Sequence, residues 1–276
     1  MTRVPGALPV PLAPWRWRAG HLATVLAGLA LLAGTEVAMA QGALDTLRRG
    51  VQSQTALNQG RTLYDARDYR GAHDRFAEAL ALDPANDEAL ALLGWSQYFL
   101  GEYRAAIITF KTALRRQSTW GGLHVGLGWS RFRLGRHHLA SEAFRAALDL
   151  NPDHVDAMVG LGSAQFELGR YEAALPPLRK AMQRLEPLAG APPPELPAVR
   201  AKTAWALYYL GRHRDALTLF EQAIRATPDW HGLHNGAGWC YLKLGEKKKA
   251  RTAFERALSL EPGYEDAAEG LRQVAG

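Results

Sequence analysis

The stretch Trp120-Gly-Gly-Leu-His-Val-Gly-Leu-Gly-Trp129 recurs almost unchanged as Trp230-His-Gly-Leu-His-Asn-Gly-Ala-Gly-Trp239, 110 residues further along the chain. The residues that follow are also alike, because Leu134-Gly135 and Leu244-Gly245 stand at the same distance after each copy. Repeat proteins are built from stacked copies of one unit, so the period of the sequence is the first property to establish. The duplicated stretch therefore predicts a repeat architecture.

A glycine recurs along the chain at intervals of 34, 34, 42 and 34 residues. The long interval contains the insertion Ala189-Gly-Ala-Pro-Pro-Pro-Glu-Leu196, whose consecutive prolines favour an extended spacer. Each period contains two stretches with apolar residues at i, i+3, i+4 and i+7, which predicts two amphipathic helices. Glycine between them favours a left-handed helix cap. The recurring glycines are Gly101, Gly135, Gly169, Gly211 and Gly245, and Arg67 takes this place in the first copy.

The spacing resembles that of the tetratricopeptide repeat family, whose motif is W-x2-L-G-x2-Y, then A-x3-F and a closing P, over about 34 residues. The A-x3-F part fits all six copies except that Leu178 replaces Phe in the fourth. The family's Trp position holds other residues here, and four Trp stand five residues later. The resemblance implies an all-α fold, a right-handed α-solenoid of six helix-turn-helix repeats with a C-terminal capping helix.

Six segments follow from this comparison. They are a signal peptide (1–40), an N-terminal helix extension (41–52), repeats one to four (53–188), a Pro-rich insertion (189–196), repeats five and six (197–264) and a capping helix (265–276). Copies two and three match copies five and six better than they match their neighbours, which indicates duplication of a three-repeat unit. A single hairpin cannot bury its own apolar face, so we expect the copies to stack into one continuous core.

The first forty residues have the layout of a secretory signal peptide. A basic leader with Arg3, Arg16 and Arg18 precedes the apolar run 22–33, which is too short for an ordinary membrane span. Ala38-Met39-Ala40 is a small-x-small cleavage site. We therefore expect cleavage after Ala40, export to the periplasm of a bacterium and no membrane span afterwards. An uncleaved membrane anchor is the alternative.

Composition limits the classes of function. Of 276 residues, 47% are hydrophobic and 22% charged, which are values of a globular protein. The formal net charge is +6 and falls to +4 without the leader, which carries three Arg and one Glu. This charge is spread along the chain and gives no evidence for nucleic-acid binding. Cys240 is the single cysteine, so no intramolecular disulfide can form.

Aromatic residues mark a candidate binding surface. Four Trp occupy the ninth position of their copies, on one helical stripe with the second, fifth and twelfth positions. The resemblance implies that this stripe lines a concave groove, where Arg133 and Lys243 can meet an acidic ligand. The alternative is that the aromatics pack against neighbouring helices and are structural. The candidate partner-binding residues are Trp95, Tyr98, Trp129, Phe132, Arg133, Trp205, Tyr208, Tyr209, Trp239 and Lys243.

Other constellations carry no predicted chemistry. His231 and His234 have a spacing that can share a metal, but no third ligand is evident nearby. Gly126-Leu-Gly128 lacks the third glycine and the preceding strand of a phosphate loop, and is expected to allow close contact between helices. We find no nucleophile elbow, metalloprotease motif or paired carboxylates. The sequence therefore predicts no catalytic residues, no metal and no cofactor.

The predicted function is that of a non-enzymatic scaffold in the bacterial periplasm or cell envelope. Its aromatic groove suits an extended apolar or Pro-rich peptide of a partner protein. The alternative is a glycan-binding accessory module in polysaccharide export or envelope assembly, because sugar rings also stack on tryptophan. The fold specifies a surface and cannot name the ligand.

Overall fold

The computed structural model describes residues 19–186 and 193–275, with side chains from residue 37 onward, and every regular element in these residues is an α-helix. The predicted all-α fold is confirmed. The helices are α1 (Ala19–Asp65), α2 (Tyr69–Leu82), α3 (Asp87–Phe99), α4 (Tyr103–Arg116), α5 (Gly121–Arg133), α6 (His137–Leu150), α7 (Val155–Glu167), α8 (Tyr171–Leu185), α9 (Leu196–Tyr209), α10 (His213–Ala226), α11 (His231–Lys243), α12 (Lys247–Leu260) and α13 (Glu265–Ala275).

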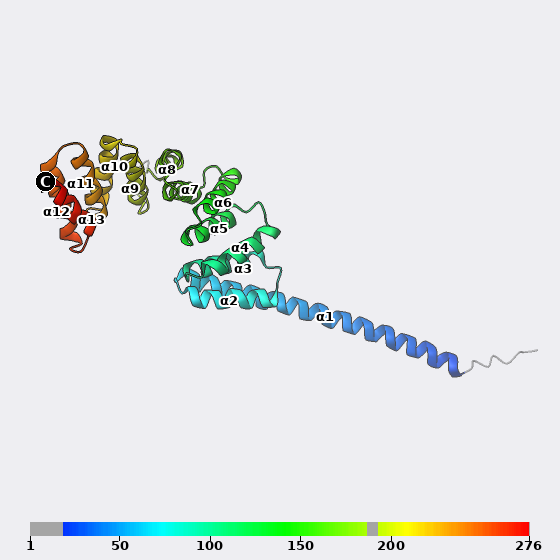
Figure 1. Ribbon diagram of the computed structural model, residues 1–276. Helices are drawn as coiled ribbons and strands as arrows, with labels where there is room; N and C mark the ends of the chain where they lie inside the picture. Colours follow the sequence, from blue (N-terminus) through cyan, green and yellow to red (C-terminus); the bar gives the residue numbers. More distant parts are fainter. Residues whose placement is uncertain (1–18, 187–192, 276) are drawn as a thin grey trace, which may run out of the picture.

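Consecutive helices pack as antiparallel pairs, and the pairs stack into a curved array (Figure 1). The first helices of successive pairs also touch one another, in the series α3, α5, α7, α9, α11 and α13. Within the described chain, the second helices make no comparable contacts with each other. The first helices therefore form the closely spaced inner layer of the curve, and this layer carries the aromatic stripe.

A left-handed residue ends the first helix of each pair. Gly101 has a φ of 79°, and the N–H of Glu102 donates a hydrogen bond of 2.8 Å to the carbonyl oxygen of Gln97. This is the backbone pattern that satisfies the last carbonyls of a helix. Arg67 adopts the same conformation in the first copy, with a φ of 61°. The other left-handed residues at this position are Gly135, Gly169, Gly211 and Gly245.

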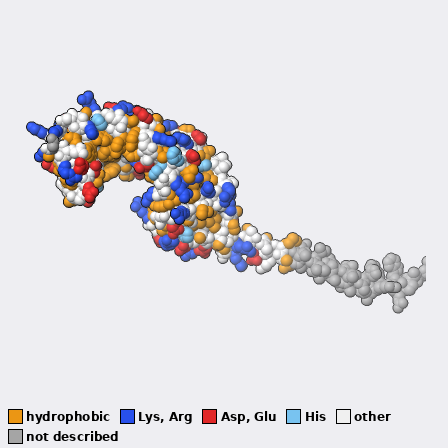
Figure 2. All heavy atoms as spheres, viewed as in Figure 1, with side chains coloured by type: hydrophobic (Ala, Val, Ile, Leu, Met, Phe, Trp, Pro, Cys, Tyr) orange, Lys and Arg blue, Asp and Glu red, His pale blue; other side chains and the backbone are white. Residues whose placement is uncertain are grey.

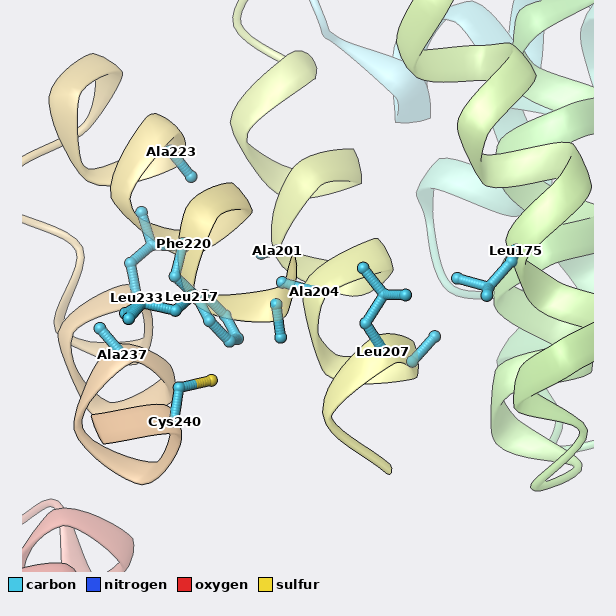
Figure 3. Packing of buried hydrophobic residues seen from close by; sticks show 12 residues of the cluster. Leu175, Ala201, Ala204, Leu207, Leu217, Phe220, Ala223, Leu233, Ala237 and Cys240 are labelled. Atoms are coloured by element: carbon cyan, nitrogen blue, oxygen red, sulfur yellow. The ribbon is translucent and has the colours of Figure 1, made fainter. Parts of the chain in front are cut away.

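The core repeats one arrangement, in which a buried Phe of a second helix lies between glycines of two first helices. A Cβ built on Gly94 or on Gly126 would approach the Phe110 ring to less than 3.0 Å. The space beside these glycines is therefore filled by the Phe ring of the neighbouring helix α4, in keeping with the close helix contact expected at Gly126. Figure 3 shows the corresponding Phe220 of α10 beside Leu217 and Leu233. The same arrangement holds for Phe144 between Gly128 and Gly160, and for Phe254 between Gly238 and Gly270.

The N-terminal helix projects from the array (Figure 1). α1 is continuous through Ala40, the predicted cleavage point, and residues 37–52 are exposed apart from Asp45. Residues 1–18 of the predicted signal peptide lie outside the described residues, as do residues 189–192 of the predicted Pro-rich insertion. In the described part of the chain, no helix combines the length and the apolar character needed to cross a membrane.

Candidate functional site

Each tryptophan at the ninth position packs against the buried Phe of its own repeat. The ring centroids lie 5.1 to 5.4 Å apart with nearly perpendicular planes, and all four indoles are half-buried. Each indole therefore contributes to the core and still presents part of its ring to the inner face. The pairs are Trp95–Phe110, Trp129–Phe144, Trp205–Phe220 and Trp239–Phe254.

The aromatic residues at the twelfth position extend this surface. Tyr98, Phe132 and Tyr208 are half-buried, and each meets the tryptophan of its own helix edge to face at 5.5 to 5.7 Å. Burial is the main cause that raises the pKa values of Tyr98 and Tyr208. These phenols are therefore neutral at physiological pH and serve as hydrogen-bonding aromatic surface.

The thirteenth position of the first helix reaches back to the second helix of the preceding repeat. Tyr209 is 53% exposed and stacks on Tyr171, with centroids 4.7 Å apart and an interplanar angle of 16°. The guanidinium of Arg133 lies 5.0 Å from the ring centroid of Tyr103. These contacts span two repeats and hold both side chains against the rim of the inner face. Lys243 at the equivalent place is exposed. Burial of the imidazole is the main cause that lowers the pKa of His213, and the positive charge of Lys243 is the second cause.

Three adjoining pockets run along the inner face of the C-terminal half, with volumes of about 480, 390 and 230 Å³. The first and second share Ala198 and Lys202, and the second and third share Trp205. We call this continuous surface the inner groove. Figure 2 shows apolar side chains gathered on the inner side of the curve. Of the predicted residues, the pockets are lined by Trp129, Trp205, Tyr208, Tyr209 and Trp239.

The other predicted residues, Trp95, Tyr98, Phe132, Arg133 and Lys243, do not line these three pockets. Phe132 approaches the groove indirectly, because the Lys202 ammonium lies 5.9 Å from its ring centroid. These three pockets are lined mainly by residues of repeats four to six, together with Trp129 of repeat three and Asp266 of α13.

The groove also contains charged residues that the sequence pattern did not predict. Asp156 and Asp266 line the first and third pockets, and Lys202 lies between the first and second. A signal was present for the two carboxylates, because they stand 110 residues apart at the second position of the same helical stripe. Lys202 occupies the sixth position, outside the stripe, and only the packing of α9 reveals its role.

His124 and His234, the paired histidines of the duplicated stretch, contact the loops that precede their helices. Nε2 of His234 lies 2.7 Å from the carbonyl oxygen of Pro228, and Nε2 of His124 lies 3.4 Å from that of Ser118. Each imidazole thus ties a first helix to the loop before it. Among the described residues, no group of three or more His, Cys, Asp or Glu is arranged to hold a metal ion.

Comparisons with known proteins address the fold. The model of a tetratricopeptide repeat family matches residues 57–119, 125–188 and 202–268, which together make up more than half of the chain. A comparison with curated proteins gave no match.

Solved structures share the architecture. The crystal structure of the APC/C hetero-tetramer Cut9–Hcn1 aligns with a TM-score of 0.67 at 20% identity, over 82% of this chain and 43% of that chain. The present chain therefore spans less than half of that protein. YrrB, described as a TPR protein with an unusual peptide-binding site, aligns at 0.61 and 19% identity, over 71% and 97% of the two chains. PilF of Pseudomonas aeruginosa aligns at 0.67 and 16% identity, over 80% and 97%. The family model matches more than half of the chain, and the helices form the pairs that this repeat is built from. The chain therefore belongs to the tetratricopeptide repeat family.

Proposed function

We propose that this protein is a non-enzymatic scaffold that binds an extended peptide segment of a partner protein in the inner groove. Proteins of this family are usually scaffolds without enzymatic activity, and they generally bind peptides or proteins. The observation that carries the proposal is the continuity of the three pockets, which share Ala198, Lys202 and Trp205. A groove that crosses several repeats matches the length of an extended chain better than that of a compact small molecule.

The groove has the surface that peptide recognition requires. The largest of the three pockets is lined by apolar residues that include Val155, Val159, Leu178 and Leu185. Half-buried aromatic side chains cost little conformational entropy on binding because the core already holds them, as it holds Trp129 and Trp205. Preorganised apolar and aromatic surface of this kind supports binding of apolar peptide side chains.

We also propose that the protein works in the bacterial periplasm or cell envelope, after export by the signal peptide that ends at Ala40. The support is the order of basic leader, apolar run and small-x-small site in the sequence. N-terminal sequencing of the chain recovered from the periplasm of the expressing bacterium tests the proposal. A chain that begins at Gln41 is the expected result, and a chain retained in the cytoplasm would contradict export.

A steric block of the groove tests the scaffold proposal. Ala198 is exposed and lines two pockets, whereas Ala173 is exposed on α8 and lines none of the three. Peptides are selected from a displayed random dodecapeptide library against the full chain, and their affinities are measured by fluorescence anisotropy. Ala198→Gln should weaken these peptides at least about tenfold, a loss of about 1.4 kcal/mol. Ala173→Gln, the matched control, should leave their affinities unchanged.

Equal affinities for wild type and Ala198→Gln would contradict peptide binding in this groove. The glycan alternative is tested by tryptophan fluorescence, because Trp129, Trp205 and Trp239 line the pockets. A saturable change on titration with oligosaccharides, together with failure to select any peptide, would replace the peptide proposal with the glycan one.

A further inference from the structure

A pocket of about 230 Å³ lies where α9, α11 and α13 meet at the C-terminal end of the inner groove. Its lining consists of four aromatic side chains and one carboxylate. The rings of Trp205 and Tyr208 are nearly perpendicular, at 80°, while Trp205 and Tyr209 are inclined by 31°. The pocket therefore presents ring faces in several directions. The lining residues are Trp205, Tyr208, Tyr209, Trp239 and Asp266.

The carboxylate is held in a defined orientation. Oδ2 of Asp266 accepts a hydrogen bond of 2.6 Å from Nδ2 of Asn235 and one of 3.1 Å from Nε1 of Trp239. Asn235 is fully buried, so its side chain has little freedom to move. Oδ2 accepts both hydrogen bonds, and in the described chain Oδ1 accepts none. One carboxylate oxygen thus stays available to a donor that enters the pocket.

The combination selects for positive charge. The face of an aromatic ring attracts a cation, and tryptophan does so most strongly. A carboxylate adds a counter-charge and a charge-assisted hydrogen bond. The pocket is too small for a folded element and is open to the groove. We propose that it receives the side chain of a Lys or Arg residue of the bound peptide, an inference that rests on the peptide-binding function proposed above.

The chain itself contains the same recognition chemistry one repeat away. The Lys202 ammonium lies 5.4 Å from the ring centroid of Phe166 and 5.9 Å from that of Phe132, and Nζ is 3.5 Å from Oε1 of Glu167. A cation, two rings and a carboxylate thus already meet in the inner groove. Among the cation–ring contacts of the described chain, none involves the four rings of the pocket. In the pocket, the basic side chain of the peptide supplies the cation that Lys202 supplies beside Phe132 and Phe166.

The field of Asp266 reaches the tyrosines of the pocket. Burial, followed by neighbouring groups that include Asp266, raises the pKa values of Tyr208 and Tyr209. The two phenols are therefore protonated at neutral pH, and each can accept a hydrogen bond from an ammonium or guanidinium group. The formal negative charge in the pocket remains on Asp266.

Selection from the random dodecapeptide library tests the inference with the full chain. Wild type should enrich Lys or Arg at one fixed position of the selected peptides, and replacing that residue by norleucine should weaken binding about tenfold. In Asp266→Asn, which keeps an oxygen acceptor for Asn235 and Trp239, the basic preference should disappear while the norleucine peptides bind as before. Asp229→Asn is the matched control, because Asp229 is an exposed carboxylate paired with Arg256 outside the pocket.

Peptides selected without a basic preference would overturn the inference and leave the scaffold proposal standing. A basic preference that persists in Asp266→Asn would overturn the assignment to this pocket. If no peptide is selected, the scaffold proposal fails, and a small probe then decides the chemistry of the pocket. Nα-acetyl-lysine methylamide should shift the indole N–H resonance of Trp239, and the norleucine analogue should not. No shift with the lysine probe would overturn the inference.

Discussion

The indole Nε1 of Trp239 in α11 donates a hydrogen bond of 3.1 Å to Oδ2 of Asp266 in α13. The same oxygen accepts from the buried amide of Asn235, so the last helix completes the polar contacts of the sixth repeat. A terminal helix was expected to cover the last repeat. It also supplies the carboxylate of the pocket, and this couples the stability of the C-terminal end to the composition of the groove.

Replacing Asp266 with Leu should destabilise the chain by about 1 kcal/mol more than replacing it with Asn. Leucine leaves the buried amide of Asn235 without its acceptor, whereas asparagine retains an oxygen there. Both variants remove the charge from the first turn of α13, so their difference isolates the hydrogen bonds. Urea unfolding gives the comparison, and equal midpoints would show that the bonds contribute nothing to stability.

Replacing glycine by alanine at two positions of α5 should change the stability of the chain in opposite directions. Gly126→Ala places a methyl group against the Phe110 ring at less than 3.0 Å, which should destabilise the chain by about 1–3 kcal/mol. Gly122→Ala meets its nearest atom, Nε1 of Trp120, at 3.6 Å. It should stabilise the helix by up to about 1 kcal/mol. Thermal unfolding of both variants checks the prediction, which is wrong if the two midpoints shift in the same direction.

Arg67→Gly should stabilise the chain by about 0.5–1 kcal/mol. A left-handed conformation costs a residue with a side chain about 1–2 kcal/mol, and the greater freedom of glycine in the unfolded chain offsets part of that gain. Arg67 has a φ of 61°, while Gly occupies the same place in five later copies. Arg67→Lys retains the strain and should be neutral. A denaturation midpoint that falls in Arg67→Gly would show that the arginine side chain contributes a compensating contact.

Alkaline pH should weaken the fold partly through Cys240. Burial raises the pKa of this thiol from its ordinary value of 9.0 to about 12. The folded chain therefore retains a proton that the unfolded chain releases above pH 9.0. Its stability contribution is complete below that value and falls by about 1.4 kcal/mol per pH unit between 9.0 and 12. Between pH 8 and 10, wild type should lose about 1.4 kcal/mol more than Cys240→Ala in urea unfolding. Equal losses of stability in wild type and Cys240→Ala would contradict the prediction.

The repeat pattern was sufficient to predict the architecture. The recurring glycines, the A-x3-F pattern and the helical spacing of apolar residues are local properties, and each hairpin packs mainly on its sequence neighbours. The sequence did not identify the ring that fills this contact, because Gly94 of α3 and Gly126 of α5 accommodate the Phe110 ring of α4 from two sides.

The stacking of the repeats, which the sequence pattern does not give, places Trp129, Trp205 and Trp239 in the walls of the three pockets. The sequence placed Trp95 and Trp205 at equivalent positions, and both pack on their Phe rings at nearly the same distance. Trp205 lines a pocket because other helices contribute residues beside it, namely Trp239 of α11 and Asp266 of α13. A periodic sequence specifies which residues share a helical face. The distances between faces depend on how successive repeats stack, and these distances define the pocket.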